Sequence, residues 1–180
     1  AVPLLVSLTD RLDARRVYLA CAALSGLALA GFALFARSFE AALFWWWLAG
    51  LGLAGTYMPG LKALTDRLPV SAQSRGTAFY TATFGVGAGL SYLWVELTQP
   101  FVEWPVLFGI AALCAAVAVV LVGFGVAGGE AAPVNHVTHD RWTSVLGNRR
   151  ILAFCGAYFG HNWELFGFRS WLVAYLTWTH

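Results

Sequence analysis

Charged residues are scarce in this sequence, and their scarcity excludes most soluble folds. Aspartate, glutamate, lysine and arginine make up 11% of the 180 residues, and lysine occurs once, at position 62. A soluble domain carries about 25% charged residues. Hydrophobic residues make up 59% of the chain, which leaves too little polar side-chain surface to cover a water-exposed globule. The composition is therefore typical of a membrane protein.

Charge is absent altogether from four long blocks. These blocks are Val17–Ala36, Ala41–Leu61, Thr77–Val95 and Trp104–Gly129. A helix needs about 20 apolar residues to cross the hydrocarbon layer, and a backbone in lipid must satisfy its own hydrogen bonds. The core helices of a soluble protein, or one cleaved signal peptide, would not produce four such blocks. The sequence therefore predicts an all-α, polytopic transmembrane helix bundle.

Cysteine and nucleotide-binding motifs are also nearly absent. The cysteines, Cys21, Cys114 and Cys155, each stand alone in an apolar block, so neither a disulfide framework nor a cysteine metal site is predicted. His136 and His139 have helical spacing but lie in a polar stretch, and we interpret them as solvated. With no glycine-rich phosphate loop and no nucleic-acid-binding basic stripe, the sequence predicts no cofactor and no nucleic-acid partner.

Five full spans and one partial helix are expected along the chain. The partial helix is Ala1–Leu8, interpreted as the tail of a helix that begins upstream. The full spans are Val17–Ala36, Ala41–Leu64, Gly76–Val95, Trp104–Val126 and Ile151–Leu176. Short segments connect them over residues 37–40, 66–75 and 96–103, and a longer polar stretch covers residues 127–150.

The basic residues and tryptophans give this topology an orientation. Because successive helices alternate in direction, nine basic residues fall on one side: Arg11, Arg15, Arg16, Lys62, Arg67, Arg75, Arg141, Arg149 and Arg150. The other side receives only Arg37, so the basic side is predicted to be cytoplasmic, in a plasma (inner) membrane. Seven tryptophans fall at the outer ends: Trp45, Trp46, Trp47, Trp94, Trp104, Trp171 and Trp178.

Pairs of small residues four positions apart predict close helix packing in the membrane. Three such pairs occur: Gly26 with Ala30, Gly85 with Gly89, and Gly156 with Gly160.

The dense cluster of charge is D-R-L-D-A-R-R, Asp10–Arg16, in which five of seven residues are charged. Its aspartates can pair with its arginines, and the positive-inside rule accounts for Arg15 and Arg16. The rule gives no reason for Asp10.

The segment Ser7–Arg16, S-L-T-D-R-L-D-A-R-R, resembles the loop between helices 2 and 3 of the major facilitator superfamily. That pattern is a glycine, three residues, an aspartate, a basic residue, any residue, a glycine and then basic residues. Three residues fit it and a fourth adds a basic charge: Asp10, Arg11, Arg15 and Arg16. Three depart from it: Val6, Asp13 and Ala14. Gly50–Pro69, followed by Ser74–Gly76, resembles helix 4 and the next loop of the same family.

The resemblance implies a fragment of a secondary transporter, running from the end of helix 2 to helix 7. Residues 1–126 would belong to the N-terminal six-helix half, 127–150 to the central cytoplasmic loop, and 151–180 to the first helix of the C-terminal half. Such proteins move a small solute by alternating access of two halves around a midplane site. The four loop residues Asp10, Arg11, Arg15 and Arg16 would act as a gating loop.

The last expected span carries the polar residues that cost most in a membrane: His161, Asn162, Glu164 and Arg169. Charged groups near mid-span, such as Glu164, usually face a cavity or a partner, whereas Arg169 lies nearer the outer end and could snorkel. His161 and Glu164 share a helix face and could carry a coupling proton, whereas Arg169 could hold an anionic solute. The alternative is a polar network that only fixes helix packing. Lesser candidates for the substrate or proton pathway lie in the second and third spans: Tyr57, Tyr80 and Thr83.

The function predicted from these residues is therefore transport of a small solute, with protons as a candidate coupling ion. A non-transporting membrane sensor or scaffold remains the alternative. A membrane-embedded enzyme is disfavoured, because the other spans offer only tyrosine and threonine near the depth of His161 and Glu164.

Overall fold

The computed structural model describes residues 5, 8–9, 12–126 and 147–179, and the regular elements within them are all helices. Contacts divide the chain into two units, Ala1–Val134 and Asn135–His180. The first unit contains α2 (Ala14–Phe35), α3 (Phe39–Ala54), α4 (Tyr57–Thr65), α5 (Val70–Thr98) and α6 (Trp104–Gly125). The second contains α8 (Arg149–Thr179). The all-α prediction is confirmed.

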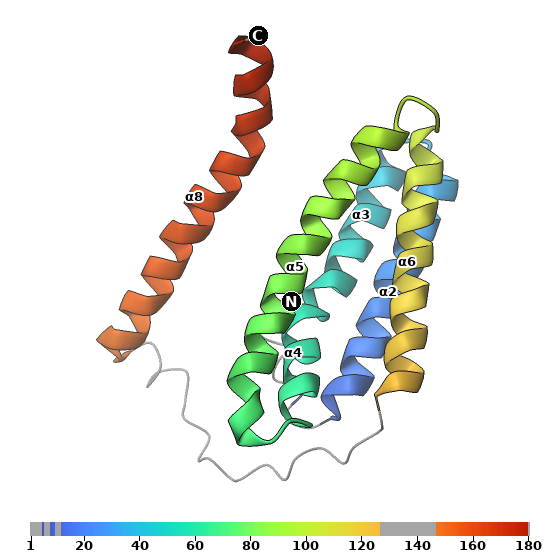
Figure 1. Ribbon diagram of the computed structural model, residues 1–180. Coiled ribbons are helices and arrows are strands. Elements are labelled where there is room, and N and C mark those ends of the chain that lie inside the picture. Colours follow the sequence, from blue (N-terminus) through green and yellow to red (C-terminus); the bar gives the residue numbers. More distant parts are fainter. Residues whose placement is uncertain (1–4, 6–7, 10–11, 127–146, 180) are drawn as a thin grey trace. The chain divides into compact units, whose positions relative to one another are not determined.

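Helix α2 is the centre of the first unit. It packs against α3 and α6 and also contacts α4, which in turn contacts α5 (Figure 1). Its buried residues recur at helical spacing and are mostly small: Ala14, Val17, Cys21, Ala22, Ser25, Ala28 and Gly31. Small side chains let helix backbones approach closely, and this packing stabilises helix pairs in lipid, where no hydrophobic force drives them together.

The contact between α2 and α3 depends on glycines of α3. A Cβ atom added to Gly52 would lie 2.6 Å from the backbone nitrogen of Ser25 and 2.8 Å from the carbonyl oxygen of Cys21. Gly55, which follows α3, lies against the side chain of Cys21. A side chain at Gly52 would meet the backbone of α2 and push the two helices apart.

The structure supports close packing at one of the three predicted small-residue pairs and not at the other two. A Cβ on Gly26 would lie 3.1 Å from the Cβ of Ala115, which confirms close packing of α2 on α6 at that position. A Cβ on Gly85 or Gly89 would meet nothing within 4 Å among the described residues, and neither would one on Gly156 or Gly160. Close packing is therefore not seen at those two pairs, whereas Gly52 and Gly55, which lie outside the predicted spacings, do pack closely.

The expectation of one continuous second span, Ala41–Leu64, is wrong. The structure divides this segment into α3 and α4 at Gly55 and Thr56. There the amide nitrogens of Gly55 and Thr56 donate to the carbonyl oxygens three residues earlier, those of Gly52 and Leu53, at 3.0 and 3.1 Å. The helix is interrupted by a tight turn, which the apolar composition of the segment did not reveal.

The polar loop expected over residues 66–75 is shorter than predicted, because α5 already begins at Val70. Pro69 precedes it in an extended conformation, and the side-chain amide of Gln73 donates to the carbonyl oxygens of Thr65 and Leu68 at 3.2 and 3.3 Å. Gln73 thereby bonds to the last carbonyl of α4 and to one in the turn that follows it, so most of these polar residues form the first turns of a helix and not a loop.

The two ends of the first unit differ in chemistry. At the end where α2 leads into α3, Phe32 packs against the rings of Trp46, Trp104 and Phe108, with centroid distances of 5.7, 5.8 and 4.5 Å. There the hydroxyl of Ser38 caps α3 by accepting from the amide of Ala41. The opposite end, where α2 begins and α4 and α6 end, carries Arg15, Lys62 and Arg67.

Two of the described helices, α2 and α6, are long and apolar enough by themselves to cross a membrane, a property that core helices of soluble proteins share. Helix α3 has only 16 residues because of the break after Ala54. Helices α5 and α8 are long enough, with 29 and 31 residues, but carry more polar side chains. Four of the five expected spans were based on charge-free length, which is a weaker condition than high mean hydropathy.

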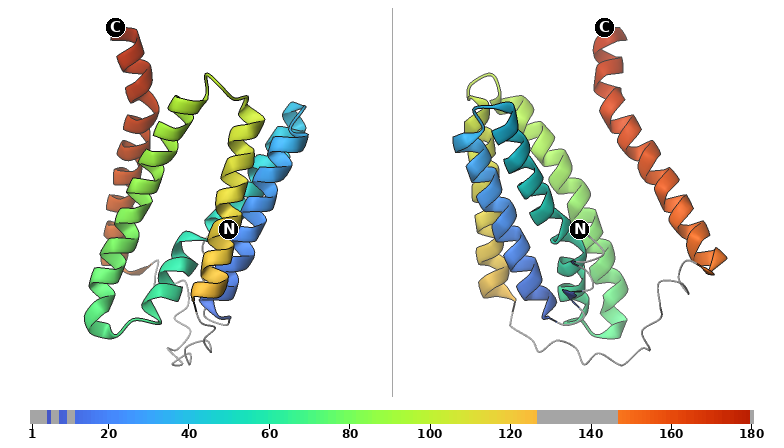
Figure 2. Two further views of the ribbon diagram at one scale, coloured as in Figure 1. Left: turned by 45° about the vertical axis from the view of Figure 1, so that its right-hand side comes forward. Right: turned by 180° about the vertical axis from the view of Figure 1, so that it is seen from behind.

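Helix α5 diverges from α6 away from their connecting turn (Figure 2). Near that turn an open apolar groove of about 730 Å³ lies between the two helices. Its lining residues are Gly87, Leu90, Ser91, Leu93, Trp94, Val95, Leu97, Leu107, Ile110, Ala111 and Cys114.

Replacing Gly52 by alanine tests the tight α2–α3 contact. The added methyl group would meet the backbone of α2, which cannot move without shifting the helix, so we expect a loss of about 1–3 kcal/mol in unfolding free energy. Gly50→Ala is the matched control, because a Cβ at Gly50 meets nothing within 4 Å. Unfolding in mixed micelles measures both variants. Equal stability of the two variants would contradict this account of the packing.

Candidate functional site

The predicted gating residues that the structure describes are Arg15 and Arg16, whereas Asp10 and Arg11 lie outside the described residues. Arg15 is in the first turn of α2, and its guanidinium donates from Nη2 to the carbonyl oxygen of Gly123 at 2.5 Å and from Nε to that of Val122 at 3.5 Å. These carbonyls belong to the last turn of α6, where a cation is favoured. Arg15 therefore ties α2 to α6 inside the first unit. Arg16 is exposed.

Asp13 contributes more to this end of the unit than its departure from the family pattern suggested. Its carboxylate caps α2 by accepting from the amide of Arg15 at 3.1 Å. The same oxygen, Oδ1, lies 3.3 Å from Nη2 of Arg67, which follows α4. Pairing of the loop aspartates with the loop arginines was predicted, but this ionic partner of Asp13 comes from a different loop. An aspartate just before a helix is a recognisable N-cap signal, whereas the pairing with Arg67 depends on tertiary structure.

Tyr57 and Tyr80 are brought together beside the turn between α3 and α4. The hydroxyl of Tyr80 donates to the backbone carbonyl of Tyr57 at 3.2 Å, and their ring centroids lie 5.7 Å apart. The hydroxyl of Tyr57 lies 3.5 Å from that of Thr81, and its ring centroid lies 5.9 Å from that of Phe84. Thr81 and Phe84 are members of this cluster that the sequence did not single out.

Thr83, the third candidate in these spans, is not part of the cluster. Its hydroxyl donates to the carbonyl oxygen of Tyr80 on its own helix at 2.7 Å.

The four polar candidates of the last span all lie on α8. A helix turns about 100° per residue, so His161 and Glu164 are about 60° apart around the axis, and Asn162 and Arg169 about 20° apart. Glu164 and Arg169 are about 140° apart. The four residues therefore spread over about 160° of the helix surface, in two stripes, His161 with Glu164 and Asn162 with Arg169, and His161 lies about 80° from Arg169.

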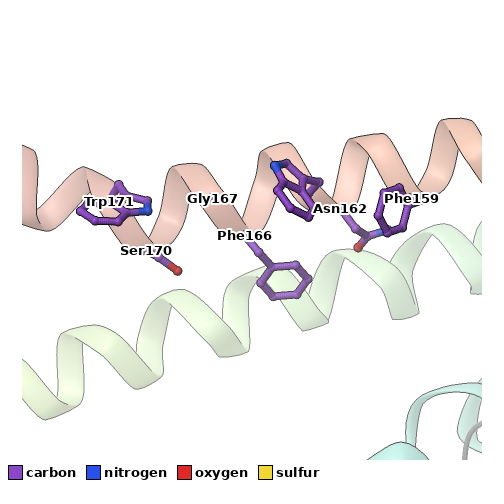
Figure 3. Close-up of a pocket in the computed structure, with 7 residues that line it drawn as sticks. Phe159, Asn162, Phe166, Gly167, Ser170 and Trp171 are labelled. Carbon is purple, nitrogen blue, oxygen red and sulfur yellow. The ribbon is translucent and has the colours of Figure 1, made fainter.

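A shallow hollow of about 510 Å³ lies along α8 and is largely aromatic in character (Figure 3). Its lining residues are Phe159, Asn162, Trp163, Phe166, Gly167, Ser170 and Trp171. Of the four predicted polar residues only Asn162 lines it, with its side-chain amide donating to the carbonyl oxygen of Tyr158 at 2.7 Å. His161, Glu164 and Arg169 are exposed on the unit that α8 forms.

Metal coordination finds no support in the described residues, where no three histidine, cysteine, aspartate or glutamate side chains gather. His136 and His139 lie outside them. The described cysteines are Cys21, which is buried against α3, and Cys114 and Cys155, which are exposed.

Comparison with known proteins identifies one family. The sequence profile of the Major Facilitator Superfamily matches residues 1–179. No curated protein and no solved structure gives a significant match.

Tyr80→Phe tests whether the tyrosine cluster stabilises the turn between α3 and α4. The variant leaves the Tyr57 carbonyl without this donor, so we expect a loss of about 0.5–1.5 kcal/mol in unfolding free energy. Tyr92→Phe on the same helix is the control, since Tyr92 is 70% exposed. Thermal unfolding in detergent micelles compares the two. A Tyr80→Phe variant as stable as Tyr92→Phe would show that this hydrogen bond does not hold the turn.

Proposed function

The chain belongs to the Major Facilitator Superfamily, a family of membrane transporters and not of enzymes, and from this we propose that it moves a small solute by alternating access coupled to protons. As a member it is an integral, multi-pass membrane protein. The observation that carries the finer proposal is the pair of polar stripes on α8. An ionisable side chain within a transmembrane helix is costly, and a role in a substrate or proton pathway is the usual reason for its presence.

The stripe of His161 and Glu164 supports proton coupling. The two residues are about 4.5 Å apart along the helix axis and share a face, so a proton can pass between an imidazole and a carboxylate without a change in the backbone. Histidine exchanges its proton near neutral pH. Among the described residues, no hydrogen bond or ion pair on α8 occupies either side chain, so both are available to a solute or to another helix.

The stripe of Asn162 and Arg169 supports an anionic solute. A guanidinium binds a carboxylate or phosphate through two parallel hydrogen bonds, and Asn162 lies on the same side of α8 beside an aromatic hollow. We propose that Arg169 holds the charged group of the solute and that the aromatic residues contact its apolar part. Separate stripes would let the proton and the solute occupy different positions.

The cluster on α4 and α5 is the proposed contribution of the first unit to the pathway. The hydroxyls of Tyr57 and Thr81 and the ring of Phe84 offer hydrogen bonds and an apolar surface next to a break in the helix. Broken helices recur at transporter binding sites because they free backbone groups within the membrane. We place Tyr57 and Tyr80 at the substrate pathway, and Thr83 at its edge.

We also propose the orientation and domain organisation. The end of the first unit with Arg15 and Arg67 faces the cytoplasm of a plasma membrane, as the excess of basic residues indicates. Residues 1–126 belong to the first half of the transporter, 127–150 form the central loop, and 151–180 begin the second half. Asp10, Arg11 and Arg16 remain proposed gating residues beside Arg15.

Glu164→Gln tests proton coupling. Full-length protein in proteoliposomes is assayed for uptake of radiolabelled small carboxylates and phosphate, with and without an inward proton gradient. We expect the gradient to accelerate uptake by the native protein and to have no effect on the variant, whose solute exchange without a gradient persists. Glu103→Gln is the control, because Glu103 is an exposed residue before α6. Gradient-driven uptake by the Glu164→Gln variant would contradict the proposal of proton coupling through Glu164.

Arg169→Lys tests the anion site. Lysine keeps the charge but cannot form the two parallel bonds, so we expect the half-saturating concentration of the anion to rise about tenfold or more while the maximal rate changes less. Arg75→Lys, at an exposed position near the start of α5, serves as the control. Failure of the native protein to take up any of the anions, or an unchanged half-saturating concentration, would contradict this assignment.

A further inference from the structure

The short helix α4 is set apart from α3 by the turn at Gly55 and Thr56. The hydroxyl of Thr56 also donates to the carbonyl of Leu53, at 2.8 Å, so the end of α3 is closed by bonds from both residues of the turn. Regular helical bonding resumes with the amide of Gly60, which donates to the carbonyl of Thr56 at 2.9 Å. Because three-residue hydrogen bonding has poorer geometry than the α-helical pattern, such turns within a helix often mark hinges.

Helices α3 and α4 are attached to the rest of the unit in different ways. Helix α3 is held by direct backbone contact, with Gly52 against Cys21 and Ser25 of α2. Helix α4 buries Pro59 and Ala63, and polar bonds hold its two ends. At its beginning, the Tyr57 carbonyl accepts from Tyr80 of α5.

The other end of α4 is held by Arg67 and Asp13. One nitrogen of the guanidinium, Nη1, donates to the carbonyl of Ala63 in the last turn of α4 at 2.8 Å, and Nη2 pairs with Asp13 at 3.3 Å. The Asp13 side chain is 9% exposed and that of Arg67 is 26% exposed. Because its carboxylate is nearly buried, breaking this pair is more costly than breaking an exposed one.

The nearby pair of Lys62 and Asp66 provides a contrast. Its atoms lie 3.2 Å apart, but both side chains are about one-third exposed and both belong to the same end of α4. Exposed pairs of this kind add little stability, and this one joins no second helix.

We propose that Asp13 is a positioning residue that locks α4 to the first turn of α2 through Arg67, and that α4 moves about the turn at Gly55 and Thr56 when this lock opens. The proposal rests on the proposed transport function, since it assigns the movement to the transport cycle. Asp13 and Arg15 then attach two different helices to the start of α2. The carboxylate of Asp13 holds the end of α4, and the guanidinium of Arg15 holds the end of α6.

The position of Asp13 explains how one residue can control movement of α4 about the turn at Gly55 and Thr56. As the N-cap of α2 it is fixed to the central helix of the unit, and α2 is in turn fixed to α3 by the Gly52 contact. The lock therefore connects α4 to α2, to which α3 is also fixed. It does so at the end of α4 that lies away from the turn at Gly55 and Thr56. Opening it frees one end of α4 without loosening α2 or α3.

Asp13→Asn is the informative variant. Asparagine remains a good N-cap but loses the charge that pairs with Arg67. We expect amide hydrogen exchange across residues 57–65 to become about tenfold faster, because a hydrogen bond to a charged group is lost. Exchange in the first turns of α2 and in α3 is expected to stay the same. The measurement uses full-length protein in lipid nanodiscs and needs no substrate.

Three further variants separate the lock from general destabilisation. Asp66→Asn, the matched control, is expected to leave exchange in α4 unchanged. Arg67→Gln is expected to match Asp13→Asn, and the double variant to exchange no faster than either single one, because both remove the same interaction. Arg67→Lys, which keeps the charge, is expected to restore part of the protection.

Unchanged exchange over 57–65 in Asp13→Asn overturns the lock, and so does faster exchange spread equally over α2, α3 and α4. The uptake assay is read separately. If α4 responds as expected but no solute is transported, the transport proposal fails and the lock stands. If transport is observed and α4 does not respond, the lock fails and the transport proposal stands.

Discussion

The close contact between α2 and α3 is the constraint on which the first unit depends. Lipid offers no hydrophobic force to bring helices together, so their association relies on close van der Waals packing. Gly52 provides it by bringing the backbone of α3 against that of α2. Helix α2 also packs closely on α6, where Gly26 lies against Ala115. The other helices of the first unit are arranged around this core.

The break between α3 and α4 follows from the same constraint. At Gly55, α3 still lies against Cys21 of α2, and the chain then turns into α4, which contacts α5. A continuous helix would have to keep one direction, whereas two short helices can each pack on a different neighbour. At the break, the amide of Gly55 donates to the carbonyl of Gly52, and the amide and hydroxyl of Thr56 donate to that of Leu53, which reduces the cost of the interruption within the membrane.

The polar residues of α8 show how helix geometry divides a sequence cluster. His161, Asn162, Glu164 and Arg169 are neighbours in the chain, but a turn of about 100° per residue distributes them over two stripes. Two stripes would give a proton and a solute separate positions along one helix, which a single site would not. The family match establishes membership and the general class of function. The individual roles of these residues are proposals that rest on their chemistry and position.

The sequence by itself determined the helical class, the family and the positions of most helices, because charge-free length and loop motifs are local properties. It located the beginning of α6 to the residue and that of α2 to within three residues. Tertiary structure decided the rest: the break at Gly55, the role of Gly52 and the pairing of Asp13 with Arg67. Each depends on which helix lies opposite, across at least 26 residues of intervening chain. A local pattern in the sequence does not indicate which distant residues the fold brings into contact.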